Sequence, residues 1–169
     1  MTLEIVIVKT ENDMETVSAL AKEIWTEHFT PIIGEPQVRY MLAKFQSAKA
    51  IRAQVSDGWE YYLVNGGGEW IGYTGLIPEP KNGKMMRSKI YVQRAHRRAG
   101  VGKRMLNFIE NRCIEERIAT LWLTVNRFND ETVSWYNRRG FEIVDAVKKD
   151  IGNGFFMDDF IMEKCIENR

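Results

Sequence analysis

An apolar strand pattern that runs into a basic, glycine-containing loop and then into an amphipathic helix most constrains how this chain can fold. The apolar stretch 90–92 is followed closely by the basic loop, Arg97-Arg98-Ala99-Gly100-Val101-Gly102-Lys103. Apolar residues then recur at helical spacing, at Val101, Met105, Ile109 and Cys113. The sequence therefore predicts a strand, a loop and a long helix.

The basic loop has the composition of an anion-binding site. Gly100 and Gly102 allow backbone N–H groups to approach a ligand without interference from a Cβ atom. The first helical turn has N–H donors without intrahelical partners and carries the positive end of the helix dipole. These features, with the charges of Arg97, Arg98 and Lys103, favour a pyrophosphate. The same pattern also fits an ordinary glycine-rich helix start on a basic surface.

A second segment follows later in the chain. The stretch 121–125 is typical of a buried strand, and after it come Asn126, Asn129, a short helix predicted over 130–139 that contains Tyr136, and Gly140-Phe141. The two segments, in this order, resemble the GNAT family of acyl-CoA-dependent N-acetyltransferases. The loop is similar to that family's Arg/Gln-x-x-Gly-x-Gly/Ala, and the second segment to its Asn, helical Tyr and Gly-Phe.

The resemblance covers nearly the whole chain and implies the GNAT acyl-CoA N-acyltransferase fold. In that α/β fold a mixed, mostly antiparallel central sheet is flanked by helices. The length of 169 residues fits one domain, 1–169.

Composition limits the other classes of function. With 24 Lys and Arg against 23 Asp and Glu, the balance gives no argument for a nucleic-acid partner. Cys113 and Cys165 lack metal-ligand spacing and lie in apolar patterns, so we expect buried thiols in a reducing compartment and no metal. The short apolar run 5–8 fits neither a signal peptide nor a membrane span. We expect a cytoplasmic protein without a membrane or nucleic-acid partner.

Hydrophobic periodicity and turn residues predict the remaining elements. The first helix is expected to be capped by Asn12 or Asp13 and to end near 26–31, before a loop at 32–34. Pro36 is expected to open a second helix, and a third covers roughly 48–55. Strands are predicted at 3–9, 59–64, 70–77, 85–92, 121–125, 141–147 and 155–162.

By resemblance, acetyl-CoA is the co-substrate. The main chain of Ile90, Tyr91 and Val92 would bind the pantetheine arm, and Val92 would face the thioester carbonyl. The N–H groups of the basic loop would hold the pyrophosphate, and Asn129 would bond to the pantetheine. These assignments cover Ile90, Tyr91, Val92, Arg97, Arg98, Ala99, Gly100, Val101, Gly102, Lys103, Asn129 and Tyr136.

Direct acetyl transfer needs a general acid and a general base. Tyr136 corresponds to the family's usual general acid beside the sulfur, and the alternative for it is a helix aromatic that fills the core. No carboxylate lies in 85–88, where some family members carry a Glu. Glu79, Glu27 and His28 are the nearest candidates for the base, and many relatives use a chain of water molecules instead.

Two further stretches, 25–34 and 150–160, look like the PaiA-type polyamine N-acetyltransferase branch. A polyamine acceptor such as spermidine or spermine needs carboxylates around its site. The candidate substrate-binding residues are Glu27, His28, Glu35, Glu79, Asp158 and Asp159. Asp158 and Asp159 alternate along a strand, so at most one points inward.

Other functions stay open. An acetyltransferase for a protein, a peptide or an antibiotic amine fits the same motifs, as does a non-catalytic acetyl-CoA-binding regulator. The presence of Tyr136 and Asn129 argues against the regulator. Many relatives form homodimers through late strands, here 155–162, and the sequence leaves the oligomeric state open.

Overall fold

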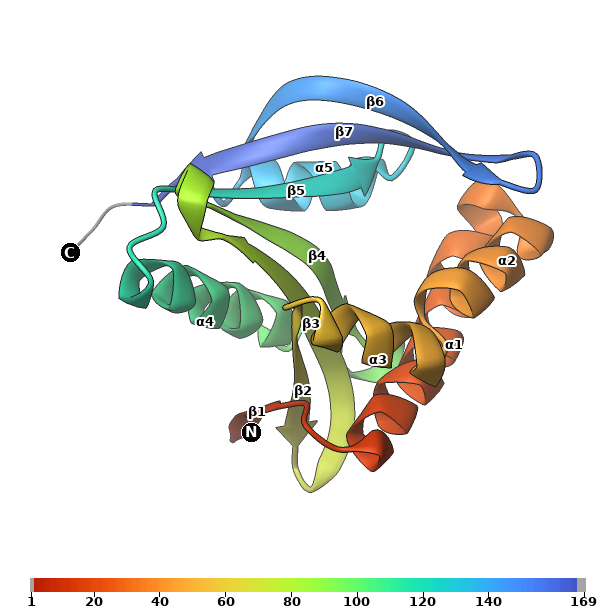
Figure 1. Cartoon of the computed structure of the whole chain (residues 1–169), viewed down its shortest axis with the longest axis horizontal. Helices are drawn as coiled ribbons and strands as arrows, with labels where there is room; N and C mark the ends of the chain where they lie inside the picture. Colours follow the sequence, from red (N-terminus) through yellow and green to blue (C-terminus); the bar gives the residue numbers. More distant parts are fainter. Residues whose placement is uncertain (1, 167–169) are drawn as a thin grey trace. The chain divides into compact units, whose positions relative to one another are not determined.

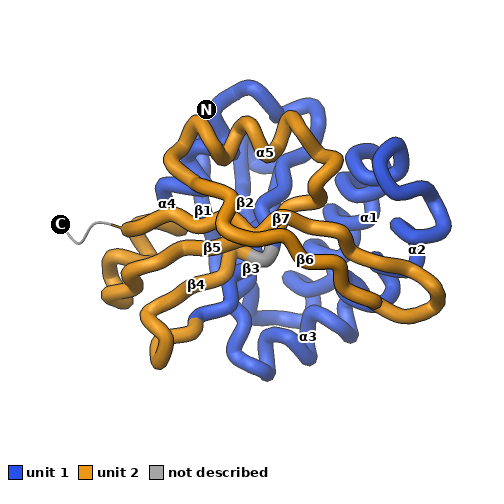
Figure 2. Tube along the Cα trace, turned by 90° about the horizontal axis from the view of Figure 1, so that it is seen from above, with its two compact units in different colours: residues 1–78, 89–108 blue, residues 79–88, 109–169 orange. Residues whose placement is uncertain are grey.

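The chain forms two compact units built from interleaved segments, as Figure 2 shows. The structure, a computed structural model, describes residues 2–166. Unit 1 contains the chain up to residue 78 together with 89–108, and unit 2 contains 79–88 and the chain from 109 onward. Strand β4 (Lys84–Val92) and helix α4 (Val101–Glu115) therefore contribute residues to both units. The single domain expected from chain length stays a prediction.

Unit 1 contains an antiparallel set of strands. β1 (Leu3–Ile7) pairs with β2 (Glu60–Gly66), and β2 pairs with β3 (Glu69–Glu79), which neighbours β4. β3 and β4 approach each other closely at Gly72, where a Cβ atom would lie 2.5 Å from the carbonyl oxygen of Tyr91. Only glycine allows β3 and β4 to come this close without a shift of the backbone.

Three helices, α1 (Glu11–Ile33), α2 (Glu35–Phe45) and α3 (Ala48–Ser56), pack on one another in unit 1 (Figure 1). The buried residues of α1 are the predicted ones, namely Met14, Val17, Leu20, Ala21, Ile24 and Trp25. The predicted cap of α1 at Asn12 or Asp13 is wrong. Thr10 is the cap, because its hydroxyl accepts from the Asp13 N–H at 3.1 Å while the Asp13 carboxylate accepts from the Thr10 N–H at 2.9 Å.

The predicted loop at 32–34 is also wrong in part, since α1 continues through Pro31 to Ile33. A proline so close to the end of a helix removes only one N–H donor from the last turns, and the helix tolerates this loss. Gly34 ends the helix with φ 86°, and its N–H bonds to the Thr30 carbonyl at 3.0 Å. Pro36 opens α2 as predicted.

A buried polar network joins the turn between α2 and α3 to the sheet of unit 1. The Gln46 amide donates to the Tyr61 hydroxyl at 3.0 Å and accepts from the Tyr73 hydroxyl at 2.7 Å. Tyr61 in turn donates to Gln54 at 2.6 Å. Beside this network, apolar residues from the sheet and α4 form a core cluster: Val64, Ile71, Val101 and Met105.

Unit 2 is a mixed sheet with strand order β4-β5-β7-β6. β5 (Thr120–Asn126) runs parallel to β4, whereas β7 (Phe155–Cys165) is antiparallel to both β5 and β6 (Glu142–Gly152). Helix α5 (Asp130–Asn137) connects β5 to β6. The observed sheet confirms the predicted fold class, with mostly antiparallel pairing and one parallel pair.

The two cysteines differ in environment. Cys113 on α4 is fully buried with its Sγ 3.9 Å from the Met85 sulfur, and burial raises the pKa of its thiol to about 12. The predicted burial of Cys165 is wrong. It is exposed, because it is the last residue of β7.

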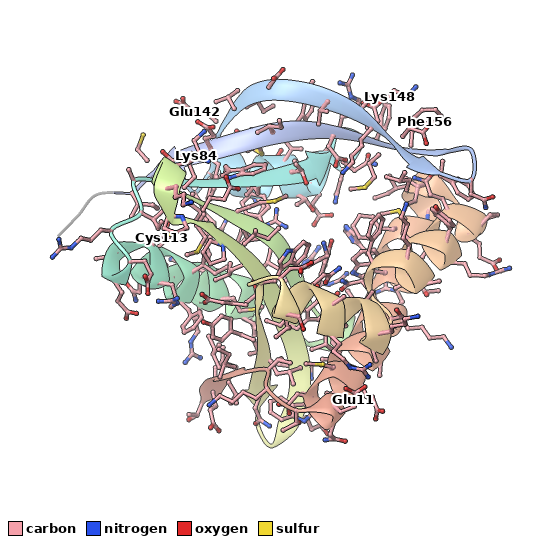
Figure 3. All side chains as sticks on the ribbon, in the orientation of Figure 1. Glu11, Lys84, Cys113, Glu142, Lys148 and Phe156 are labelled. Carbon is pink, nitrogen blue, oxygen red and sulfur yellow. The ribbon has the colours of Figure 1, made fainter. Side chains whose placement is uncertain are left out.

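The hairpin of β6 and β7 forms one edge of the sheet of unit 2. Most of β6 is exposed. At one end of the hairpin, Lys148 Nζ lies 5.0 Å from the centre of the Phe156 ring (Figure 3). In the described part of the chain, every helix is too short or too polar to span a membrane.

Candidate functional site

The basic loop of unit 1 connects β4 to α4. A short 3₁₀ helix, Arg94–His96, follows β4, and the residues from Arg97 to Gly100 are exposed. The Arg97 Nε donates to the Val92 carbonyl at 3.0 Å, which fixes the start of the loop against the end of the strand. The Gly100 carbonyl accepts from the Arg104 N–H at 3.1 Å and so begins the helix.

Two residues in the left-handed region shape this loop. Arg98 has φ 66° and Gly100 has φ 78°. By helical geometry, the N–H groups from Gly100 to Lys103 have no intrahelical acceptor. They lie at the start of α4, next to the exposed cations of Arg97, Arg98 and Lys103. The arrangement suits an anion with several oxygen atoms, and the assignment to a coenzyme pyrophosphate stays a prediction.

The strand that precedes the loop presents its side chains to the interior of unit 1. Ile90 and Val92 pack against the core cluster around Ile71 and Met105. Tyr91 contacts Trp25 of α1, with 5.5 Å between the ring centres. Any ligand bound along this part of β4 would therefore meet main-chain atoms.

In unit 2, the pairing of β4 with β5 ends at a defined point. The parallel register runs from Lys84 opposite Thr120 to Arg87 opposite Leu123. β5 continues to Asn126, where it pairs with Asp159 of β7. Asn129, which is buried, directly precedes α5.

Tyr136 lies on α5 and is 1% exposed. The motif Gly140-Phe141 explains how it is held. Gly140 has φ 92°, which turns the chain back so that the Phe141 N–H bonds to the Tyr136 carbonyl at 3.2 Å. The Phe141 ring then packs edge-on against the Tyr136 ring at 5.2 Å between centres. Tyr136 thus fills core space.

Two guanidinium groups modify the acidity of Tyr136. Burial raises the pKa of its phenol above the usual value of 10.0, whereas the positive charges of Arg87 and then Arg139 act to lower it. The Arg87 Cζ lies 5.1 Å from the centre of the Tyr136 ring. The Arg139 guanidinium instead lies over the Trp135 ring at 3.7 Å. Tyr136 with Arg87, Trp135, Arg139 and Phe141 is called the Tyr136 cluster below.

Arg87 is the residue that sequence reasoning missed. It was noted only as a position without a carboxylate, yet it is 5% exposed and donates through Nη2 to the Thr124 carbonyl at 3.3 Å. The signal was an arginine inside a strand pattern whose inward-facing residue Met85 is fully buried. A charged residue at such a position needs a specific partner.

The acidic candidates fall in different parts of the molecule. Glu27, His28 and Glu35 belong to unit 1, whereas Glu79, Asp158 and Asp159 belong to unit 2. Glu27 is exposed, and Glu35 is exposed and forms an ion pair with Arg39. His28 packs edge-on against the Phe29 ring.

Asp158 and Asp159 differ in their surroundings. Asp158 forms an ion pair with Arg127 at 2.8 Å, so its charge is already balanced. Asp159 is 6% exposed and lies opposite Asn126 in the register. Asp159 is therefore the buried carboxylate of this pair.

A second cation on β4, Lys89, was also not singled out. Its Nζ lies 5.8 Å from the centre of the Trp25 ring and 5.7 Å from that of Trp59. Trp25 itself is buried and packs against Phe29. Trp25 is therefore part of the interior of unit 1, whereas Phe29 and Trp59 are half-buried.

A hollow of about 460 Å³ opens among α1, α2 and α3 of unit 1, and its lining includes Ser18, Lys22, Arg39 and Gln46. None of the predicted site residues lines it. Among the described residues, no group of three or more His, Cys, Asp or Glu side chains is placed to hold a metal ion.

Solved structures with the same fold carry the name acetyltransferase. The PaiA N-acetyltransferase from Thermoplasma acidophilum, in complex with coenzyme A, is 24% identical over 98% of this chain and 99% of its own, with TM-score 0.79. A GCN5-related N-acetyltransferase from Rhodopseudomonas palustris is 15% identical over 98% and 96%, with TM-score 0.81. The ribosomal-protein-S18-alanine N-acetyltransferase from Escherichia coli is 16% identical over 98% and 95%, with TM-score 0.73.

Sequence comparison gives the family. None of the curated proteins matches this chain in sequence. A family model described as the acetyltransferase (GNAT) family matches residues 19–141, which is most of the chain and contains both the basic loop and Tyr136. This protein therefore belongs to the GNAT family and is an acetyltransferase.

Proposed function

We propose that the protein transfers the acetyl group of acetyl-CoA directly to a primary amine of a small molecule, with a polyamine such as spermidine or spermine as the acceptor. The family supports the reaction class. The similarity in fold to a PaiA N-acetyltransferase in complex with coenzyme A supports the choice of co-substrate. The choice of acceptor rests on the stretches 25–34 and 150–160, which resemble the PaiA-type polyamine N-acetyltransferase branch.

The basic loop supports the binding of acetyl-CoA. The N–H groups of the first helical turn and the charges of Arg97, Arg98 and Lys103 match a pyrophosphate. The main chain from Ile90 to Val92 would bond to the pantetheine arm as an added strand. The buried Asn129 would add a side-chain contact, and the main chain of Val92 would face the thioester carbonyl.

The observation that carries the proposal is the environment of Tyr136. Its ring is buried and lies beside the Arg87 guanidinium, with 5.1 Å between the Arg87 Cζ and the ring centre. Burial raises the pKa of the phenol, and the positive charges of Arg87 and Arg139 act to lower it. A phenol held beside cations in this way is suited to donate its proton to a ligand atom, here the sulfur of the leaving thiolate.

The acceptor side of the proposal rests on Asp159. A polyamine carries several ammonium groups, and a buried carboxylate binds one of them far more strongly than an exposed carboxylate does. Asp158 is only half-buried and forms an ion pair with Arg127. Glu27 and Glu35 are exposed and would contribute less.

Thiol release from acetyl-CoA, measured with a panel of acceptors, tests this function. The panel contains spermidine, spermine, simple diamines, amino acids and short peptides. We expect saturable turnover with the polyamines. Asp159→Asn should raise KM for the polyamine strongly, whereas the matched change Asp145→Asn, at an exposed position on β6, should leave it unchanged.

Two results would contradict the proposal. Turnover with peptides but not with polyamines would assign the enzyme to a macromolecular acceptor. Binding of acetyl-CoA without turnover of any amine would assign the chain to a regulatory role.

A further inference from the structure

Arg87 occupies a place in unit 2 where an apolar residue would be expected. It forms the last pair of the β4–β5 register, opposite the fully buried Leu123. Burying a guanidinium costs free energy unless its surroundings compensate the charge. An apolar side chain of similar volume would fill this space without that cost, so the position of Arg87 calls for a function.

The geometry around Arg87 gives that function a target. One side of the guanidinium is anchored, since Nη2 donates to the Thr124 carbonyl at 3.3 Å. The same group lies 5.1 Å from the centre of the Tyr136 ring. A cation near an aromatic ring is attracted to its face, and it stabilises a phenolate much more than a neutral phenol.

Other charges near Tyr136 are weaker or directed elsewhere. Arg139 follows α5, is half-buried, and donates to the Trp135 carbonyl at 2.9 Å. Lys164 on β7 lies 5.9 Å from the Phe141 ring centre and forms an ion pair with Glu110 of α4. Of the charged groups that face the phenol, the buried Arg87 is therefore the one that solvent screens least.

We propose that Arg87 is a positioning residue for acetyl transfer: anchored on Thr124, it holds the Tyr136 ring and stabilises the phenolate that forms when Tyr136 gives up its proton. The inference rests on the proposed function of Tyr136 as the general acid. It adds a residue that determines how strong an acid Tyr136 is.

The proton balance defines the step. The acceptor nitrogen forms a bond to the acetyl carbon, the carbon–sulfur bond breaks, and the electron pair stays on sulfur. The sulfur takes the proton of the Tyr136 hydroxyl, and the phenolate that remains next to Arg87 regains a proton from the acceptor nitrogen through water. Arg87 keeps its charge throughout, so its effect is electrostatic.

Two substitutions at position 87 test the inference. Arg87→Met removes the charge and keeps an unbranched side chain, while Arg87→Lys keeps the charge without the planar group. Arg112→Met is the matched control, since Arg112 is a largely covered arginine of unit 2 that pairs with Glu115 and Glu116 on the surface of α4. The first readout needs no substrate. 3,5-Difluorotyrosine is placed at position 136, and its ionisation is followed by ¹⁹F NMR.

We expect the titration midpoint to rise by about one to three pH units in Arg87→Met, and to stay near that of the parent protein in Arg87→Lys and Arg112→Met. Each unit is a factor of ten in the proton-transfer equilibrium, so kcat of Arg87→Met should fall about tenfold or more with little change in KM for acetyl-CoA. In a Tyr136→Phe background, Arg87→Met should have almost no further effect on kcat.

The outcomes separate the two proposals. A titration that does not move in Arg87→Met, or a loss of kcat that adds fully to that of Tyr136→Phe, would overturn the role of Arg87 alone. Full turnover by Tyr136→Phe would overturn the proposed acid, and the inference with it. Partial rescue of kcat by Arg87→Lys, combined with a raised midpoint in Arg87→Met, would support both.

Discussion

In their proposed roles, the basic loop acts through its backbone and the Tyr136 cluster acts through its side chains. The loop is exposed, and its distinctive feature is backbone geometry, with φ 66° at Arg98 and φ 78° at Gly100. The Tyr136 cluster is buried, and its distinctive feature is a pair of side chains, Tyr136 and Arg87, which are 1% and 5% exposed. The loop should therefore tolerate many changes of side chain but few changes of backbone preference, and the cluster should show the reverse.

The largest effect is expected for Tyr136→Phe. Loss of a general acid lowers kcat by about 100- to 10,000-fold, and the ring that packs on Phe141 is retained. KM for acetyl-CoA and the free energy of unfolding should change little.

In the parent enzyme, kcat should fall as the pH rises through the raised pKa of Tyr136, because the acid form is lost. This fall of kcat at high pH should disappear in Tyr136→Phe. Steady-state kinetics from pH 6 upward give both results, and an unchanged kcat would assign Tyr136 to the core alone.

Gly100→Ala should show the next largest effect. An alanine at φ 78° costs about 1–2 kcal/mol, so the exposed loop should relax into another conformation and the affinity for acetyl-CoA should fall about 5- to 30-fold. Gly58→Ala is the matched control, because Gly58 also has a positive φ, 101°, and open space around its Cβ position. Calorimetric titration with coenzyme A compares the two, and equal affinities would contradict the role given to the loop backbone.

Asp13→Ala lies outside both regions and separates stability from function. Loss of the capping box should lower the free energy of unfolding by about 1 kcal/mol, with kcat and KM unchanged. Hydrogen bonds from the Thr10 and Lys9 N–H groups hold the pKa of Asp13 below its usual 3.8. Because the pKa of Asp13 is lower in the folded protein than in the unfolded chain, its ionised carboxylate stabilises the fold at pH values above the unfolded-state pKa. The difference in the free energy of unfolding between the parent protein and Asp13→Ala should therefore be complete above about pH 4. It should vanish as the pH falls through the folded-state pKa. Urea unfolding at several pH values measures it.

The smallest effect is expected for Arg98→Gly. The change removes an exposed charge but relieves the strain of a side chain at φ 66°. The two contributions oppose each other, so the affinity for coenzyme A should stay within about threefold of that of the parent protein. A much larger loss that disappears in high salt would show that the loop acts through its side-chain charges.

Local sequence signals predicted much of the fold. The residues that define the inward face of α4, namely Val101, Met105, Ile109 and Cys113, are all buried, because helical periodicity reports burial directly. Gly140-Phe141 was found only through its resemblance to the GNAT motif; it lies just after α5, and Gly140 has φ 92°. The errors at Thr10 and Pro31 are errors of helix ends, where two or more residues can take the same role.

Signals that depend on pairing across the sheet were harder to predict. Asp158 and Asp159 alternate along β7 as predicted, and only Asp159 is buried. Which of the two is buried follows from the pairing of β7 with β5 and β6, which the alternation of one strand does not give. Arg87 was missed for a related reason, because its partners Thr124 and Tyr136 lie far along the chain.

The interleaving of the two units has a consequence for synthesis on the ribosome. Unit 1 needs the second half of β4 and the first turns of α4, so it lacks part of its sheet and core until residue 108 has emerged. By then, residues 79–88 of unit 2 are already synthesised, but their partner strand β5 is not. The nascent chain must therefore keep the unpaired first half of β4 from pairing wrongly while the rest of unit 2 is translated. No cut at a single peptide bond would separate one complete unit from the other.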